Sequence, residues 1–191
     1  MEIRNAKKEN ARDLAHLINI AGEGIPQQLW NGLIEAGESW LDAGTRRAAR
    51  EEGSFSYKNA RVCLENDSLL GMVIAYKQPD PYEIEDLAEY PEIVQPLIVL
   101  ESRVPGSWYI NAIATYQEYR GRSVARMLLA DSEELAKENC CMLMSLIVAS
   151  ENTTAKSLYE YLGYKDIATL PIIPNQGSIH NGNWILMTRD L

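Results

Sequence analysis

The chain has 191 residues, of which 46% are hydrophobic and 24% are charged, so it is long enough for one substantial core. Its net charge of −9 argues against non-specific binding to nucleic acid. An acidic surface keeps a protein soluble, and it also suits a cationic acceptor such as a polyamine or a lysine side chain. The charge alone leaves both interpretations open.

No stretch approaches the apolar length needed to cross a bilayer, and the N-terminus lacks an apolar signal region. The three cysteines are Cys63, Cys140 and Cys141, and their spacing favours neither a disulfide nor a metal site. We therefore expect a cytoplasmic protein with no membrane partner and no metal.

The first part of the chain is expected to be mainly helical. Apolar residues recur at helical spacing after a short extended start, and Pro26 suits the first turn of a second helix. The elements expected are a strand at 2–5, a helix at 8–20, a helix from Pro26 that carries Leu29, Leu33 and Ile34, and a short helix near 45–51.

A β-hairpin is expected next, with strands at 60–64 and 69–76 joined by a turn at Glu65-Asn66-Asp67. The following connection, 77–106, is long and contains an apolar run at 93–100 that favours a helix. A connection of this length usually carries structure or function of its own.

The rest of the chain alternates strands and helices. The expected elements are a strand at 108–114, a helix at 124–137, an interior strand at 142–148, a helix at 152–162, and strands at 164–170 and 184–189. Two apolar faces on the 124–137 helix indicate that it is buried against a sheet. This order predicts an α/β fold, a mixed sheet with helices on both faces.

A loop that contains glycine joins the strand at 108–114 to the helix at 124–137. The unpaired N–H groups at a helix N-terminus point outward and carry partial positive charge, which favours phosphate. Gly121 permits close approach, while Arg120 and Arg122 add charge-assisted contacts. Taken alone, the segment is equally well explained as an ordinary loop with two solvated arginines.

The same segment resembles the pyrophosphate loop of the GNAT superfamily of acetyl-CoA-dependent N-acyltransferases. That loop has the pattern Arg/Gln-x-x-Gly-x-Gly/Ala, and this chain has Arg120-Gly121-Arg122-Ser123-Val124-Ala125. The preceding Ala-Thr-Tyr-Gln-Glu-Tyr is similar to the family's usual Ala-Val-x-Pro-x-Tyr. Ser123 stands where glycine is usual, and Gln117 stands where proline is common.

A second motif of the family follows downstream. The family pattern Asn-x-x-Ala-x-x-Leu-Tyr-x-x-x-Gly-Phe/Tyr is matched from Asn152 to Tyr164. Asn152 suits a helix N-cap and Gly163 suits the residue after a helix. By resemblance, Tyr159 lies near the cofactor sulfur and protonates the departing thiolate. The helix pattern by itself favours a core tyrosine at this position.

The resemblance implies a single GNAT domain over residues 1–191, an α/β fold with a mixed, mostly antiparallel central sheet and helices on both faces. It implies an N-acetyltransferase in which a primary amine of a small molecule or peptide attacks acetyl-CoA directly. Tyr159 is the expected catalytic residue. The residues expected to bind acetyl-CoA are Ile113, Ala114, Thr115, Arg120, Gly121, Arg122, Ser123, Val124, Ala125, Asn152 and Tyr159.

The motifs do not specify the general base or the acceptor pocket. Many relatives carry a glutamate on the fourth strand, whereas this strand reads Ile110-Asn111-Ala112-Ile113. A water molecule is one alternative, and the candidate side chains, each otherwise a solvated residue, are Glu83, Glu85, Asp86, Glu101 and His180. The aromatic residues that could line a pocket, each otherwise a packing residue, are Trp30, Trp40, Tyr82, Tyr90 and Trp108.

Two other functions remain. Ser123 and the missing strand carboxylate suggest a non-catalytic acyl-CoA-binding regulatory module. A different phosphate-binding enzyme is disfavoured, because the chain has neither a Gly-x-x-x-x-Gly-Lys-Ser/Thr loop nor a Gly-x-Gly-x-x-Gly fingerprint. Small enzymes of this family are often dimers, so the resemblance also makes a homodimer an expected assembly, which the sequence itself does not specify.

Overall fold

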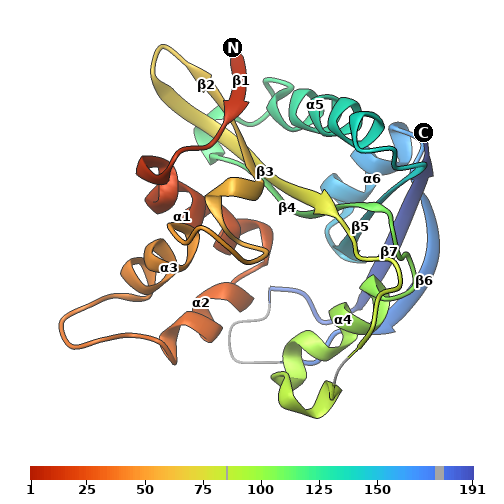
Figure 1. The fold of residues 1–191 in the computed structure, drawn as a ribbon, viewed down its shortest axis with the longest axis horizontal. Helices are drawn as coiled ribbons and strands as arrows, with labels where there is room; N and C mark the ends of the chain where they lie inside the picture. The colour runs from red at the N-terminus through yellow and green to blue at the C-terminus, as the bar shows by residue number, and fades with distance from the viewer. Residues whose placement is uncertain (85, 175–178) are drawn as a thin grey trace. The chain divides into compact units, whose positions relative to one another are not determined.

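The computed structural model describes residues 1–84, 86–174 and 179–191. Its strands form a seven-stranded sheet in the order β1-β2-β3-β4-β5-β7-β6 (Figure 1). The pair β4–β5 is parallel, and the pairs β1–β2, β2–β3, β5–β7 and β6–β7 are antiparallel. The expected α/β fold with a mixed, mostly antiparallel sheet is therefore confirmed.

The chain packs as two compact units, which are described separately. The first unit comprises Met1–Ala75 and Asn111–Glu134, and the second comprises Tyr76–Ile110 and Leu135–Leu191. Strands β3 and β4 and helix α5 each contribute residues to both units. The strands are β1 (Glu2–Asn5), β2 (Ala60–Glu65), β3 (Ser68–Lys77), β4 (Trp108–Thr115), β5 (Leu143–Ala149), β6 (Lys165–Pro171) and β7 (Asn183–Asp190).

The helices of the first unit pack their apolar sides together. Leu14, Leu17 and Ile18 on one side of α1 are fully buried, as the helical spacing predicts. Trp30 of α2 is buried and stacks on Trp40 of α3 with 6.3 Å between the ring centroids. The helical segments are η1 (Lys8–Asn10), α1 (Ala11–Ala21), α2 (Ile25–Asn31), α3 (Trp40–Ala48), η2 (Tyr57–Asn59), η5 (Gln117–Tyr119) and α5 (Val124–Glu138).

Two helix boundaries in this unit differ from the sequence prediction. Helix α2 ends before Gly32, so Leu33 and Ile34 lie outside it and are about two-fifths exposed. Helix α3 begins at Trp40, several residues earlier than expected. Ser39 and Asp42 explain the early start, because they form a capping box in which each side chain accepts a backbone N–H of the other.

The second unit is built on strands β5, β6 and β7, with helix α4 packed against β6 and β7. Leu146, Leu186 and Met187 are buried in its core. The apolar run predicted to be helical forms the end of η4 and most of α4. The remaining helical segments are η3 (Leu87–Glu89), η4 (Glu92–Val94), α4 (Gln95–Glu101) and α6 (Thr153–Tyr161).

The long connection 77–106 is closed at its stem by two backbone hydrogen bonds. Gln78 N donates to Ser107 O at 2.8 Å, and Gly106 N donates to Pro79 O at 3.2 Å. Ser107 Oγ lies 2.7 Å from Ser145 Oγ of β5, which ties the stem to the sheet of this unit. The segment therefore leaves and rejoins the fold at one place.

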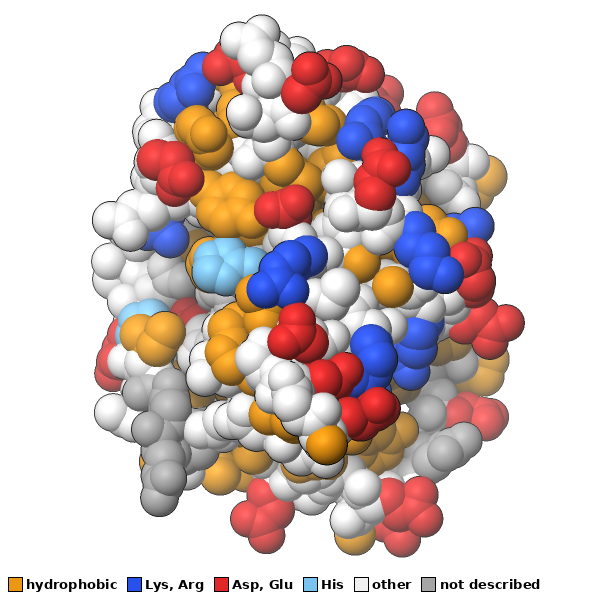
Figure 2. Space-filling view, turned by 90° about the vertical axis from the view of Figure 1, so that its left-hand side faces the viewer, with side chains coloured by type: hydrophobic (Ala, Val, Ile, Leu, Met, Phe, Trp, Pro, Cys, Tyr) orange, Lys and Arg blue, Asp and Glu red, His pale blue; other side chains and the backbone are white. Residues whose placement is uncertain are grey.

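Figure 2 shows a face on which acidic and basic side chains are interspersed. Among the described residues, no helix is both long enough and apolar enough to span a bilayer.

Candidate active site

The backbone of the 120–125 loop turns twice through the left-handed region. Gly121 has φ +77° and Ser123 has φ +64°. Glycine adopts this conformation freely, whereas a residue with a Cβ atom pays about 1–2 kcal/mol for it. Ser123 thus has a backbone conformation that glycine would adopt without strain. Helix α5 starts at the next residue, so the loop leads directly into a helix N-terminus.

Gly71 of β3 allows strand β4 to approach closely just before this loop. A Cβ atom at Gly71 would lie 2.6 Å from Ala114 O, 3.0 Å from Val124 Cγ1 and 3.1 Å from Thr115 Cα. Gly71 belongs to none of the motifs found in the sequence. An isolated glycine inside a strand pattern often marks a close backbone approach, so the signal was present.

Side chains anchor the segments on both sides of the loop. After β4, the Tyr116 hydroxyl donates to Asp13 Oδ1 at 2.6 Å, and its ring stacks on His16. Burial, together with the hydrogen bond to Asp13, raises the pKa of Tyr116. On α5, Asp131 accepts two hydrogen bonds, at 2.7 and 2.8 Å, from Arg61 of β2. Strand, loop and helix are therefore held in one arrangement within the first unit.

The two loop arginines differ in their surroundings. Arg122 Nη2 lies 2.6 Å from Glu65 Oε2, and its guanidinium lies over the Tyr119 ring. Arg120 is exposed, and its side chain makes no ion pair or hydrogen bond with another described residue. Arg120 is thus the loop cation with no acidic partner in the described part of the chain.

The remaining predicted cofactor residues of the first unit lie along the end of β4 and the start of α5. Thr115 Oγ1 is buried and has no hydrogen-bond partner among the described residues. A buried hydroxyl without a partner costs free energy unless a ligand or water supplies one. Ala114 and Val124 are buried, Ile113 and Ala125 are half-buried, and Gly121 and Ser123 are exposed. The Thr115 hydroxyl and the Arg120 guanidinium suit a ligand that has an anionic group and a polar chain.

The second motif forms a capped helix in the second unit. The Asn152 side chain accepts from Ala155 N at 3.3 Å, as the N-cap prediction requires. Gly163 ends the helix with φ +91°. Tyr159 is the buried side chain of α6. Its ring centroid lies 5.9 Å from that of Tyr164, and its hydroxyl makes no hydrogen bond with a described residue.

Burial raises the pKa of Tyr159 to about 12. The phenol is therefore fully protonated at neutral pH and is a hydrogen-bond donor there. A thiol has a pKa of roughly 8.5, so complete proton transfer from this phenol to a thiolate is unfavourable. The hydroxyl suits hydrogen bonding to a developing thiolate better than it suits full proton donation.

The candidate bases of the 77–106 connection differ in their burial and hydrogen bonding. Glu83 is exposed, and Asp86 is an exposed residue that caps η3 by accepting from Ala88 N. Glu85 lies outside the described residues. Glu101 of α4 differs from these, because Tyr109 and Tyr82 donate to its two carboxylate oxygens at 3.1 and 3.2 Å. Burial raises the pKa of Glu101, against the lowering effect of these hydrogen bonds. His180 is half-buried in the loop before β7.

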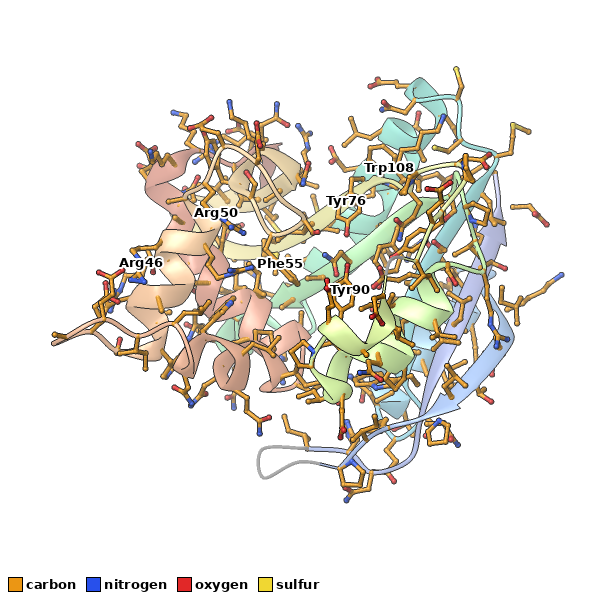
Figure 3. The ribbon with its side chains drawn as sticks, turned by 60° about the horizontal axis from the view of Figure 1, so that its bottom comes forward. Arg46, Arg50, Phe55, Tyr76, Tyr90 and Trp108 are labelled. Carbon is orange, nitrogen blue, oxygen red and sulfur yellow. The ribbon has the colours of Figure 1, made fainter. Side chains whose placement is uncertain are left out.

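The candidate aromatic residues are divided between the two units. Trp30 and Trp40 stack on each other in the first unit, where Trp30 also packs against Gly44. In the second unit, Trp108 is buried and Tyr90 is exposed. Figure 3 labels Trp108, Tyr90 and Tyr76, the last of which packs edge-on against Tyr109. Among the described residues, Tyr82 is the one of the five candidates that hydrogen-bonds a candidate base.

Comparison with known proteins identifies the family of this chain. Residues 25–164 match the acetyltransferase (GNAT) family. The chain belongs to that family. This GNAT acetyltransferase is thus an acyltransferase, and its relatives generally take the acetyl group from acetyl-CoA. At the level of sequence, the GNAT chain matches no curated protein.

Solved structures share the fold of this GNAT acetyltransferase. An N-acetyltransferase from Staphylococcus aureus Mu50 is 20% identical, with a TM-score of 0.67 over 99% of this chain and 100% of the other. A polyamine N-acetyltransferase of Drosophila melanogaster, which forms N-acetylagmatine, is 15% identical, with a TM-score of 0.70 over 100% and 99% of the two chains. At these identities the similarity shows the fold alone. Within the described residues of the GNAT chain, no cluster of His, Cys, Asp or Glu could hold a metal ion.

Proposed function

We propose that this GNAT chain, acting as a single domain, transfers an acetyl group from acetyl-CoA to a primary amine of a small molecule or peptide by direct attack. The observation that carries the proposal is the 120–125 loop, in which Gly121 and Ser123 take the left-handed conformations that lead into helix α5. A loop of this kind directs backbone N–H groups at a phosphate. The Arg120 side chain adds an unpaired charge beside it.

The residues of β4 and α6 take the remaining roles in this proposal. Acetyl-CoA supplies a thioester, and the backbone of 113–115 pairs with its pantetheine arm as an added strand would. The N–H near Ala114 donates to the carbonyl oxygen of the acetyl group, and Thr115 Oγ1 offers a hydroxyl to the arm. Tyr159, with its raised pKa, donates a hydrogen bond to the leaving sulfur.

The acceptor is an amine in other members of the family, and two solved relatives are named for acetylating polyamine or agmatine. The net charge of −9 agrees with a cationic acceptor. Free cysteines at Cys63, Cys140 and Cys141 agree with a reducing compartment such as the cytoplasm. A homodimer is one assembly compatible with this proposal, since small enzymes of the family are often dimers.

Acetyl-CoA binding and amine-dependent release of CoA test the proposal. We expect acetyl-CoA to raise Tm, and at least one of agmatine, 1,4-diaminobutane, spermidine and an N-terminal peptide to accelerate CoA release above the hydrolysis rate. Arg120→Ala should weaken acetyl-CoA binding, while Lys7→Ala, which changes an exposed lysine of the first unit, should not. Binding without turnover on any amine would instead favour a regulatory acyl-CoA-binding module. No binding of acetyl-CoA would overturn both.

A further inference from the structure

Glu101 occupies an unusual position for a carboxylate. It is the last residue of α4, where the negative end of the helix dipole disfavours a negative charge. Burial also disfavours the charged form and raises the pKa of its side chain. No lysine or arginine among the described residues forms an ion pair with it. A role in folding does not account for a carboxylate placed at this cost.

The groups around this carboxylate are organised as a binding site. Tyr109 donates to Glu101 Oε1 at 3.1 Å, and Tyr82 donates to Oε2 at 3.2 Å. Tyr109 is almost fully buried, and Glu101 keeps part of its surface exposed. The two tyrosine hydroxyl groups fix the orientation of the Glu101 carboxylate, and the residue itself is half-buried. These residues, together with Gln78, are called the Glu101 cluster below.

Gln78 gives an independent indication of a ligand. Its side chain is 97% buried, since only 3% of its surface is exposed. It lies close enough to Glu101 to lower the pKa of that carboxyl, yet its Nε2 has no partner of hydrogen-bond geometry among the described residues. Buried amide groups are normally satisfied, so one left open beside a carboxylate indicates a missing polar partner.

Aromatic rings surround the same place. Tyr76 packs edge-on against Tyr109 with 6.1 Å between ring centroids (Figure 3). The pKa of Tyr82 is raised by burial first, then by Glu101, and least by Tyr76 and Tyr90. Tyrosine faces attract organic cations. A carboxylate with no ion-pair partner among the described residues, in a group of tyrosines, is complementary to an alkylammonium group.

We infer that the Glu101 cluster is the acceptor site of the enzyme, where Glu101 pairs with a primary alkylammonium group and then takes its proton. This inference rests on the proposed acetyl transfer. It assigns the base to the 77–106 connection, whereas the strand that carries a glutamate in many relatives has no acid in this chain.

The proton and electron balance of the step is complete. One N–H bond of the ammonium breaks and its proton moves to a Glu101 oxygen, which leaves a neutral amine. The nitrogen lone pair forms the C–N bond, the C–S bond breaks, and sulfur takes that electron pair. A second proton from nitrogen neutralises the thiolate, and Glu101 releases its own proton to solvent. The products are the acetamide, free CoA thiol and one proton.

Glu101→Gln tests the inference by both activity and binding. The best amine of the panel should lose at least about 10²-fold in kcat/KM, with the KM for acetyl-CoA within about twofold of wild type. In calorimetry without acetyl-CoA, 1,4-diaminobutane should bind the wild type but not Glu101→Gln, and the neutral 1,4-butanediol should bind neither. Glu89→Gln, which changes an exposed glutamate of the same connection, is the matched control.

Four further measurements separate catalysis from packing. Glu101→Asp keeps a carboxylate and should recover part of kcat, while Tyr82→Phe should raise the KM of the amine about 10-fold. In the wild type kcat/KM should rise with pH through the raised pKa of Glu101, and Glu101→Gln should lack that limb. Because a raised carboxyl pKa makes the folded state lose stability as pH rises, Glu101→Gln should be at least as stable as wild type at pH 8.

The outcomes are distinguishable. If the wild type acetylates an amine and Glu101→Gln keeps kcat/KM within twofold, the acceptor site lies elsewhere and only this inference is wrong. If no amine is acetylated but 1,4-diaminobutane binding depends on Glu101, the ammonium site stands and the transfer reaction fails. If the wild type binds neither 1,4-diaminobutane nor agmatine, the inference is overturned.

Discussion

The 120–125 loop and the Glu101 cluster differ in how they are built. The loop is a contiguous, exposed segment whose shape comes from the backbone at Gly121 and Ser123. The cluster is formed by side chains from separate elements, with Glu101 on α4 and Tyr109 on β4, and its chemistry comes from burial. On the functions proposed above, a phosphate would be recognised by local conformation and an amine by tertiary packing.

Tyr159 gives the largest expected effect and cuts across this division, because it is a buried side chain of the second unit that should act on the cofactor. We expect Tyr159→Phe to lower kcat by about 10²-fold, since the leaving sulfur loses its hydrogen-bond donor. The Kd of acetyl-CoA should change by less than threefold. Calorimetry and single-turnover kinetics give the two quantities, and an equal loss in both would mean that the tyrosine only packs.

The second prediction breaks the loop through its support. Gly71→Ala places a methyl group 2.6 Å from Ala114 O, so the strand must shift. We expect a loss of about 2 kcal/mol in the free energy of unfolding, measured in urea, and weaker acetyl-CoA binding. Amine binding at the Glu101 cluster should survive in the folded fraction. Gly32→Ala, where φ is −74° and the nearest atom to the added Cβ, Leu29 O, lies 3.6 Å away, is the control for replacing a glycine without crowding.

The 120–125 loop, Gly71 and Glu101 show what could and could not be predicted from the sequence. The order of the elements followed from periodicity, because helices and strands bury apolar residues at different spacings, and the loop between β4 and α5 was located by a local sequence motif. An isolated glycine in a strand pattern marked Gly71 for close approach, but the strand and helix that crowd it are known only from the folded chain. From the sequence alone, Glu101 could not be distinguished from the other candidate acids, because its burial and its tyrosine contacts exist only in the folded chain.

The third prediction compares the two arginines of the loop. Arg120→Ala should raise the Kd of acetyl-CoA about 10-fold, because a charge-assisted contact to phosphate is lost. Arg122→Ala should have a smaller effect, since Arg122 is already paired with Glu65. Calorimetry with acetyl-CoA at low and high salt measures both. A larger effect for Arg122 would show that the Glu65 pair opens when the cofactor binds.

The smallest effect is expected at Ser123. Ser123→Gly removes the cost of φ +64° for a residue with a Cβ atom, so the free energy of unfolding should increase by about 1 kcal/mol or remain unchanged. Acetyl-CoA binding should be preserved or tightened. If the variant instead binds acetyl-CoA much more weakly, the serine hydroxyl is itself a ligand. Ser123→Ala, which lacks the hydroxyl but keeps the Cβ atom, separates the two causes.

The closed stem of the 77–106 connection has an evolutionary consequence. Two backbone hydrogen bonds, from Gln78 to Ser107 and from Gly106 to Pro79, hold its ends together, and neither bond involves a side chain. Backbone bonds place little demand on residue type, so recombination between relatives could exchange the whole segment as a cassette without disturbing the phosphate loop. Acceptor preference in such enzymes would then diversify faster than cofactor preference. A chimera that carries the 80–105 segment of a relative on this scaffold would have the amine preference of that relative.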